Sequence, residues 1–274
     1  MEVSATAYYR YARGTSYRET AAQKICREKV RTCFYDHRRR YGSRRIAAEL
    51  KIGRCKARSA MRHEGLRAIA PKRFKPQTTD SRHDSPISPN LLQADAPPPG
   101  IGLCVVGDIT YLPLKDGGFC YLACFQDKLT RRIIGWQVSN RMTAQLVMDA
   151  FSSARRRGLI KREAIIHTDR GSQYASAEYR RLLYIGGFRQ SMSRKGNCYD
   201  NAQAESFFSR FKAELVENGV FESVTDAKSE IFSYIEGYYN RIRLHSGLGY
   251  KSPMQFENEL NLKTKTRSRE SFVC

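Results

Sequence analysis

The sequence predicts an α/β protein with a mixed β-sheet, preceded by a small all-helical domain. Three observations lead to this fold class. Over residues 101–260, three strand-like segments come first, and helix-like and strand-like segments then alternate. Residues 17–70, within a first domain predicted over residues 1–70, show only helix-like segments. Seven of the nine prolines fall within residues 71–100, which predicts a linker between the two domains.

The first domain is expected to contain a helix-turn-helix. Helices are predicted over residues 21–35, 43–50 and 54–64, and Ile25, Val30 and Phe34 are candidate buried positions of the first. Two short helices around a glycine-containing turn fit a motif whose second helix enters a DNA groove. A helical hairpin with a solvated basic face is the alternative. The basic side chains of the second helix belong to Arg54, Lys56, Arg58 and Arg62.

The second domain is expected to carry the sheet. Strands are predicted over residues 105–114, 119–127, 132–138, 164–167 and 189–192. A tight turn at residues 115–118 joins the first two strands as a hairpin. Helices are predicted over residues 143–157, 177–185, 201–215 and 227–239. The tail, residues 261–274, fits no motif and is expected to be disordered or poorly packed.

Charge points to a polyanionic partner. The chain carries 48 Lys and Arg against 27 Asp and Glu, a net charge of +21. Residues 1–100 hold +13 of this and residues 101–274 hold +8, so the first domain is the more basic per residue. Such an excess favours binding to nucleic acid, and a basic protein that is merely kept soluble by its charge is the alternative.

Several protein classes are excluded. No apolar run approaches the ~20 residues that span a membrane, and the N-terminus lacks a signal-peptide pattern. None of the eight cysteines has the spacing of a zinc module. Without an export signal a disulfide framework is not expected, so the thiols are expected to be reduced, in a cytoplasm.

Three carboxylates fall where this fold would bring them together. Asp108 lies inside a predicted strand, where aspartate is disfavoured, and Asp169 follows the end of another. Glu205 lies near the start of a helix. Two carboxylates ~4 Å apart repel by about 4 kcal/mol at an effective dielectric of ~20. A divalent metal relieves this repulsion, and oxygen ligands favour Mg²⁺ or Mn²⁺, which support phosphoryl transfer on nucleic acids.

Each carboxylate also has a structural explanation. Asp169 could cap the turn at residues 170–172, and Glu205 could be a solvated helix residue. Asp127 also ends a strand, but it is expected to pair with Arg131 or Arg132 rather than to bind a metal. The constellation of Asp108, Asp169 and Glu205 is therefore the specific signal.

Five segments carry motifs of one known family. Residues 107–111 and 167–174 surround the two aspartates, and residues 191–208 run into the glutamate. Residues 41–46 precede the core, and residues 238–253 follow it. Together they resemble the second-reading-frame product of insertion-sequence-three transposases, in the retroviral-integrase superfamily. The match runs from about residue 20 to residue 257.

The resemblance implies a function and a set of partners. It implies an RNase H-like core in which Asp108, Asp169 and Glu205 hold two Mg²⁺ or Mn²⁺ ions. Family members nick one strand at an element end with water, and the freed 3′-hydroxyl then attacks a second phosphodiester. The implied partners are double-stranded DNA (terminal repeats and target), the first-reading-frame product or fused segment, and further copies of the chain on DNA. The implied location is the bacterial cytoplasm, at the nucleoid, with no membrane partner.

The resemblance also implies DNA contacts. Lys212 follows Glu205 by seven residues, which puts both on one helical face. His167 and Gln173 could support the metal ligands, contact DNA or serve only the fold. The loop over residues 194–201 is expected to lie near DNA through Arg194, Lys195, Asn197 and Asn201. In the first domain the expected DNA contacts are Arg44, Arg45, Arg54, Lys56 and Arg58.

Three alternatives to an independent transposase stay open. The family's active protein is usually a frameshift fusion, and this chain shows no leucine heptads, so it is expected to be the second-frame product alone. It could then be a DNA-binding regulator, or a catalytic fragment that is inactive without the first-frame segment. A plain nuclease on the same fold is the alternative among enzymes, and it would lack strand transfer.

Overall fold

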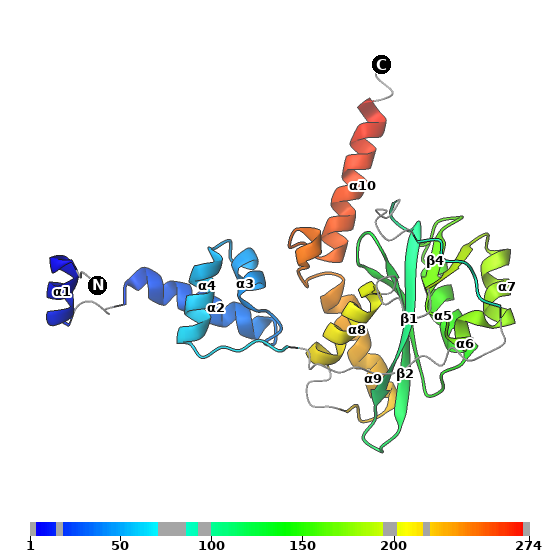
Figure 1. Cartoon of the computed structure of the whole chain (residues 1–274), viewed down its shortest axis with the longest axis horizontal. Coiled ribbons are helices and arrows are strands. Elements are labelled where there is room, and N and C mark those ends of the chain that lie inside the picture. The colour runs from blue at the N-terminus through cyan, green and yellow to red at the C-terminus, as the bar shows by residue number, and fades with distance from the viewer. Residues whose placement is uncertain are drawn as a thin grey trace. The chain divides into compact units, whose positions relative to one another are not determined.

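The chain divides into two compact units, Met1–Ile69 and Ala70–Cys274 (Figure 1). The structure is a computed structural model, and it describes residues 4–14, 19–70, 86–92, 100–193, 202–215 and 220–270.

The first unit is helical throughout its described residues. Helix α2 begins with a capping box, in which Thr20 and Gln23 each accept the other's backbone N–H. A hydrogen bond of 3.0 Å from the Ile52 N–H to the Ala47 carbonyl closes the turn between α3 and α4. The helices are α1 (Ala5–Ala12), α2 (Ala21–Asp36), α3 (Ser43–Glu49) and α4 (Arg54–His63).

The core of the first unit is small and lies between α2, α3 and α4. The rings of His37 and Tyr41 stack 3.7 Å apart at its centre. Ile25, expected to be buried, is instead 57% exposed, because the buried positions of α2 all lie in its second half. The buried apolar side chains are Val30, Cys33, Phe34, Tyr41, Ile46, Ala47, Ala57, Ala60 and Met61.

The second unit is built on a five-stranded mixed sheet in the order β3-β2-β1-β4-β5. Strand β1 is central, pairing antiparallel with β2 and parallel with β4. This is the predicted RNase H-like sheet, and it brings β4 beside β1 although a helix and two strands separate them in sequence. The strands are β1 (Cys104–Pro113), β2 (Phe119–Asp127), β3 (Ile133–Ser139), β4 (Ile165–Thr168) and β5 (Arg189–Met192).

Two glycines permit close approaches in this sheet. At Gly107, a Cβ would lie 2.5 Å from the ring of Phe125, so only glycine lets that ring cover the strand. At Gly135, a Cβ would lie 2.4 Å from the Ala150 carbonyl oxygen, so helix α5 packs directly onto β3.

The predicted hairpin turn is present, and Gly117 has φ 84° there.

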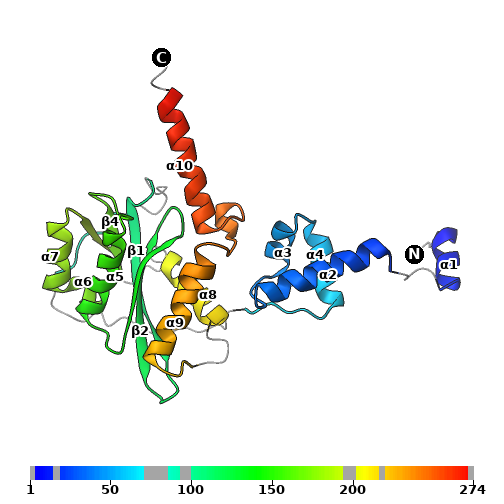
Figure 2. The same cartoon turned by 180° about the vertical axis from the view of Figure 1, so that it is seen from behind.

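Helices cover both faces of the sheet (Figures 1 and 2). One face packs around Phe125 and Phe151, and the other around Phe207 and Phe211. The first face is covered by α5 (Ala144–Arg156), α6 (Ser172–Ala175) and α7 (Ala177–Ile185). The second is covered by α8 (Ala202–Leu215), α9 (Val224–Phe232) and a π-helix, Ser233–Tyr239.

The C-terminal part differs from the sequence prediction in two places. The helix expected over residues 227–239 is α-helical only to Phe232 and then widens into the π-helix. After a 3₁₀ turn, Ser246–Leu248, helix α10 (Pro253–Glu270) runs through most of the tail that was expected to be disordered. Its first half is anchored, because Arg132 of the loop before β3 pairs with Glu257 at 2.7 Å.

A buried ion pair joins α8 to the segment after the π-helix. Arg243 donates to both carboxylate oxygens of Glu214, at 2.8 and 2.5 Å. The Tyr234 hydroxyl donates to the same carboxylate at 2.9 Å. Because the side chains of Arg243 and Glu214 are only 2% and 3% exposed, this pair is part of the second core.

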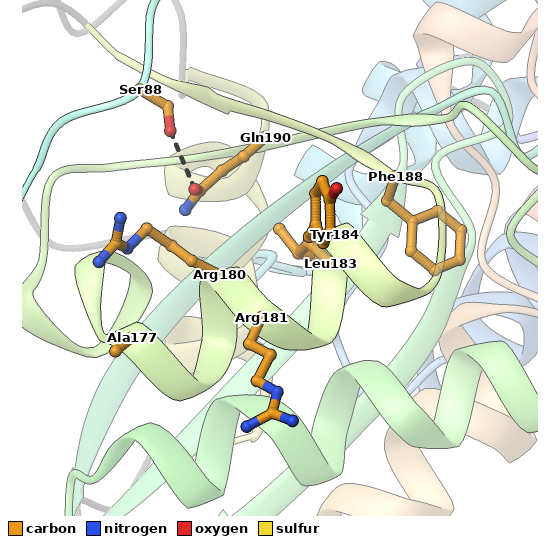
Figure 3. Close-up of a pocket in the computed structure, with 8 residues that line it drawn as sticks. All are labelled: Ser88, Ala177, Arg180, Arg181, Leu183, Tyr184, Phe188 and Gln190. Atoms are coloured by element: carbon orange, nitrogen blue, oxygen red, sulfur yellow. Dashed lines mark hydrogen bonds between the residues drawn. The ribbon is translucent and has the colours of Figure 1, made fainter.

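Residues 86–92, here called the strap, run along β5. The Met192 N–H donates to the Pro89 carbonyl at 3.4 Å, and the Leu91 N–H donates to Ser191 Oγ at 2.9 Å. The Ser88 hydroxyl donates to Gln190 Oε1, also at 2.9 Å (Figure 3). The strap therefore bonds to three consecutive residues of β5.

The cysteines and the possibility of a membrane-spanning helix were both considered from the sequence. The six cysteines of the described ranges are all free thiols, of which four are buried, Cys26 is half-buried and Cys55 is exposed. Cys198 and Cys274 lie outside those ranges. No helix within the described residues is long and apolar enough to cross a membrane.

Candidate active site

Asp108 lies at the centre of the sheet, in β1. It faces Cys124 across the β1–β2 pair, and its Oδ1 accepts the Ile109 N–H at 2.8 Å. The side chain is half-buried. The negative charge of Asp108 affects the pKa of three neighbours. It adds to burial in raising the pKa of Cys124 and of Tyr174. It also opposes the effect of burial, which lowers the pKa of Lys212.

Asp169 lies directly after the last residue of β4. Its Oδ1 accepts the Gly171 N–H at 3.0 Å, so it does cap the turn that leads into α6. The carboxylate of Asp169 is half-buried. Its negative charge also contributes to raising the pKa of Tyr174. The structural and the chemical explanations of Asp169 are therefore compatible.

Tyr174 interacts electrostatically with both aspartates. Burial, followed by the negative charges of Asp108 and Asp169, raises the pKa of the Tyr174 hydroxyl well above its ordinary value. Both carboxylates therefore lie near one buried side chain, although sixty residues separate them in the chain. The parallel pairing of β1 with β4 produces this convergence, since it sets Val106 beside His167.

Glu205 is not gathered with the two aspartates. It lies in the first turn of α8, and it is exposed, although partial desolvation raises the pKa of its carboxyl group. Within the described ranges, no group of three or more His, Cys, Asp or Glu side chains is arranged to hold a metal ion. The structure thus brings two of the three predicted carboxylates together and leaves the third apart.

Lys212 connects α8 to the aspartates. Its ammonium nitrogen lies 4.4 Å from the centroid of the Tyr111 ring, a cation–π contact on β1. Burial lowers the pKa of Lys212, and the nearby charge of Asp108 acts in the opposite direction. Glu205 lies two helical turns before this contact on the same helix.

His167 and Gln173 are held by protein groups. His167 is fully buried in β4, and its Nδ1 lies 2.8 Å from Ser191 Oγ of β5. Gln173 donates from Nε2 to the Met142 carbonyl at 3.4 Å, toward the start of α5. Both side chains thus contact the framework on either side of Asp169.

Comparisons with known proteins agree on one family. The integrase core domain family matches residues 101–198, and a second integrase core domain family matches residues 205–260. The chain is 40% identical over 245 residues to the transposase for insertion sequence element IS904 of Lactococcus lactis, across 88% of this chain and 96% of the relative. It is 42% identical over 239 residues to transposase InsF for insertion sequence IS3A of Escherichia coli K12, across 85% of this chain and 82% of the relative.

This chain belongs to the insertion-sequence-three family of transposases. The transposase also resembles solved structures at low sequence identity. One is a simian T-cell lymphotropic virus intasome in complex with a phosphatase regulatory subunit, at 15% identity and a TM-score of 0.46, across 84% of this chain and 74% of that one. Another is the HTLV-2 integrase catalytic core domain in complex with magnesium, at 13% identity and a TM-score of 0.44, across 57% of this chain and 97% of that one.

Most of the transposase's expected DNA contacts in the first unit are exposed. Arg54, Lys56 and Arg58 all point away from the core of α4, whose buried positions are Ala57, Ala60 and Met61. Arg44 is exposed in α3, whereas Arg45 is half-buried with its guanidinium 5.6 Å from the Tyr41 ring centroid. Arg194, Lys195, Asn197 and Asn201 lie outside the residues that the structure describes.

Sequence reasoning assigned the wrong partner to one residue of the transposase and overlooked others. Asp127 is buried and does not pair with Arg131 or Arg132 through its carboxylate. Its oxygens accept the Gly102 N–H at 2.8 Å and both the N–H and the hydroxyl of Thr130, at 2.7 and 2.8 Å. Tyr174 and Ser191 were overlooked, because a sequence motif shows their identity but not their burial or their neighbours.

The transposase also has a cavity of about 570 Å³ between α7 and β5 (Figure 3). None of its lining residues is a predicted site residue, so the cavity does not define the catalytic centre. The lining side chains belong to Ser88, Ala177, Arg180, Arg181, Leu183, Tyr184, Phe188 and Gln190.

Proposed function

We propose that this transposase cuts one DNA strand at each end of its insertion sequence and joins the freed 3′-hydroxyl to another phosphodiester. The supporting observation is the convergence of Asp108 of β1 and Asp169 after β4 on the buried Tyr174. Two acidic groups in a chain of net charge +21 are an arrangement suited to metal-assisted phosphoryl transfer, since cations attract the backbone and carboxylates hold the metal.

The donor set fits a hard divalent cation. Asp108 and Asp169 offer oxygen ligands, which Mg²⁺ and Mn²⁺ prefer. The fit is supported by the Tyr174 hydroxyl, a buried polar atom whose pKa both carboxylates help to raise and which has no hydrogen-bond partner within the described residues. We propose two ions per site, with Glu205 as the third ligand. When bound, such ions activate the attacking oxygen and stabilise charge on the leaving oxygen.

The chain's own residues orient the substrate. The position of Lys212 beside Asp108 suits it to a phosphate of the DNA end, and the proposal gives it that contact. The same helix carries Glu205, so binding of a DNA end along α8 would favour its approach to the aspartates. Asp169 keeps its turn by accepting the Gly171 N–H, which fixes the orientation of its carboxylate.

The partners follow from this chemistry. Double-stranded DNA of the terminal repeats and of the target would bind the exposed basic residues of α4 and the loop over residues 194–201. Because an element has two ends, at least two copies of the chain would act together on DNA. The first-reading-frame product, or a segment of it fused to this chain, would be the remaining partner.

Strand cleavage and transfer by the purified chain test this proposal. A duplex that ends in the host element's terminal repeat is incubated with Mn²⁺ or Mg²⁺, using the wild-type chain and Asp169→Asn. Nicking and strand transfer are expected for the wild type, with a loss of at least a hundredfold in the variant, because asparagine removes the metal-binding charge. Nicking without strand transfer would instead identify a plain nuclease.

Asp116→Asn is the matched control. Asp116 also accepts an N–H two residues ahead, from Gly118 at 2.8 Å, so this change keeps the same kind of turn and lies in the β1–β2 hairpin. It should leave activity unchanged. Equal losses in both variants would show that turn geometry, not metal binding, explains the effect.

The exposed position of Glu205 favours a second candidate, a catalytic fragment that is inactive until the first-frame segment joins it. Under this alternative the chain binds DNA in a salt-sensitive way but neither nicks nor transfers strands. Fusing the first-frame segment should then restore both reactions. Glu205→Gln should abolish them in the fusion, whereas Glu230→Gln, an equally exposed glutamate on α9, should not.

A further inference from the structure

Tyr174 is held firmly on every side except at its hydroxyl. It lies in α6 and is 1% exposed. Its backbone N–H donates to the Gly171 carbonyl at 3.0 Å, and its own carbonyl accepts from Gln190 Nε2 at 2.7 Å. Its ring packs edge-on against the Tyr179 ring, with centroids 5.6 Å apart. The position of the hydroxyl is therefore set by the fold.

The Tyr174 hydroxyl is buried without a hydrogen-bond partner within the described residues. A buried polar atom without a partner destabilises the folded state, and phenylalanine would fill the same space without this cost. Packing alone therefore does not account for the oxygen, and its neighbours must be considered.

The neighbours of Tyr174 supply an explanation. A Cβ built at Gly171 would lie 3.1 Å from Asp169 Oδ1 and 3.7 Å from Tyr174 Cδ2, so the carboxylate and the ring meet on one side of this turn. The negative charges of Asp108 and Asp169 add to burial in raising the pKa of Tyr174. A tyrosine hydroxyl carries its proton at neutral pH in any case, so it is available as a hydrogen-bond donor.

We propose that Tyr174 is a positioning residue of the active site, whose hydroxyl donates to the carboxylate oxygens of the Asp108–Asp169 pair when they hold a divalent cation. This inference rests on the proposed function. Groups that hydrogen-bond to metal ligands fix the orientation of those ligands and raise metal affinity. The Tyr174 hydroxyl thus gains a hydrogen-bond partner on metal binding, and this gain adds to the affinity for the ion.

Tyr179 provides a matched control. It is fully buried in α7, its hydroxyl also has no partner within the described residues, and its ring touches that of Tyr174. Burial alone raises the pKa of Tyr179, without a contribution from either aspartate. Tyr179→Phe therefore removes a similar oxygen from the same core but away from the carboxylates.

The test compares Tyr174→Phe and Tyr179→Phe with the wild-type chain by thermal unfolding. Unfolding midpoints are measured in EDTA and across a titration with MnCl₂ alone. In EDTA both variants should unfold at or above the wild-type midpoint, because each loses an unpartnered buried hydroxyl. With Mn²⁺, only Tyr174→Phe should need a concentration at least roughly tenfold higher for half of the stabilisation. Cleavage should show the same shift in Mn²⁺ requirement, with a near-normal rate at saturation.

Two results would overturn the inference. One is a Mn²⁺ titration of Tyr174→Phe that coincides with the wild type, and the other is an equal shift in Tyr179→Phe. If Mn²⁺ fails to stabilise the wild type, or stabilises Asp169→Asn equally, the metal site itself is disproved and the inference falls with it. Stabilisation of the wild type but not of Asp169→Asn, with an unchanged Tyr174→Phe, would reject only the role of Tyr174.

Discussion

Single residues of this transposase serve its fold and its proposed chemistry in different ways. Arg243 belongs to the C-terminal signature of the sequence, yet its guanidinium is buried inside the protein, where it donates to Glu214 and lies 3.3 Å from His245 Nε2. Asp127 resembles a site residue by its position at a strand end, yet it organises a turn. Charge at a strand end or within a motif therefore does not by itself indicate a site, and the neighbours decide.

Breaking the buried ion pair should destabilise the protein strongly. Glu214→Gln leaves the Arg243 charge buried without its counter-charge, and such a change costs about 3–5 kcal/mol of the free energy of unfolding. Urea denaturation followed by circular dichroism measures the loss.

Glu222→Gln is the control for this prediction. Glu222 pairs with Lys115 at 2.9 Å, but both side chains are well exposed, so its loss should change stability by less than about 1 kcal/mol. Similar losses for Glu214→Gln and Glu222→Gln would contradict the structural role assigned to the buried pair.

Helices α3 and α4 form the element with the clearest DNA-binding chemistry. The buried side of α4 consists of small residues and Met61, and its exposed side is basic. Gly53 precedes α4, so its N-terminus is open to an approaching phosphate. The arrangement agrees with a groove-reading helix, although a solvated basic helix would have the same polarity.

Removal of charge from α4 separates these two explanations. The double variant Lys56→Ala, Arg58→Ala should bind DNA more weakly and should reduce the slope of log affinity against log salt by up to about 2, one for each lost phosphate contact. Fluorescence anisotropy with a labelled terminal-repeat duplex measures both quantities.

The double variant Lys24→Ala, Lys29→Ala removes the same charge from exposed positions of α2 and serves as the control. It should change the salt slope much less. If the α2 variant lowers the slope as much as the α4 variant does, binding follows net charge alone, and α4 has no special role.

The elements were predicted well wherever periodicity carries the information. The strands of the sheet lie within a residue or so of their predicted bounds, because apolar alternation and the glycine-containing turn mark them. The π-helix was missed because its widened turn leaves no distinct periodicity in the sequence. Ile25 was wrongly expected to be buried, because apolar spacing does not show which part of a helix packs against other elements. The tail carries no motif, yet α10 continues through Glu270.

At the scale of the whole molecule, many acidic groups are held neutral by burial. Burial raises the pKa of the Cys33 thiol in the first unit and of the Cys104 thiol in the second to about 11. The unfolded chain releases these protons near pH 9, so between pH 9 and 11 the native state binds more protons than the unfolded state. Stability should therefore be full below pH 9 and fall as pH rises through this range.

Cys104→Ala tests this pH dependence. Its free energy of unfolding should fall less steeply between pH 8.5 and 10.5 than that of the wild type, by up to about 1.4 kcal/mol per pH unit. The measurement is urea denaturation under reducing conditions. Cys55→Ala, at an exposed thiol, should retain the wild-type slope, and parallel slopes for Cys104→Ala and the wild type would contradict the assignment.

The candidate site was predictable in part. Asp108 was identified because an aspartate inside a strand is disfavoured, and Asp169 because sites form at the strand ends of α/β sheets. The parallel β1–β4 pair brings the two strands together. The surroundings of the pair could not be predicted, since the identity of Tyr174 does not show that its hydroxyl is buried without a partner. The approach of Glu205 remains a prediction, because it depends on more than the sheet.

Both outer strands of the sheet are partly covered by other segments of the chain. On β3, the side-chain amide of Asn240 donates to the Ile133 carbonyl and accepts the Ile133 N–H, each at 3.0 Å, as a neighbouring strand would. On β5, the strap fulfils the same purpose. Uncovered strand edges recruit other chains into aggregates. A transposase whose copies are proposed to act together on DNA is thereby less prone to join its sheets edge to edge, so that its assembly can be directed by the nucleic acid and not by β-aggregation.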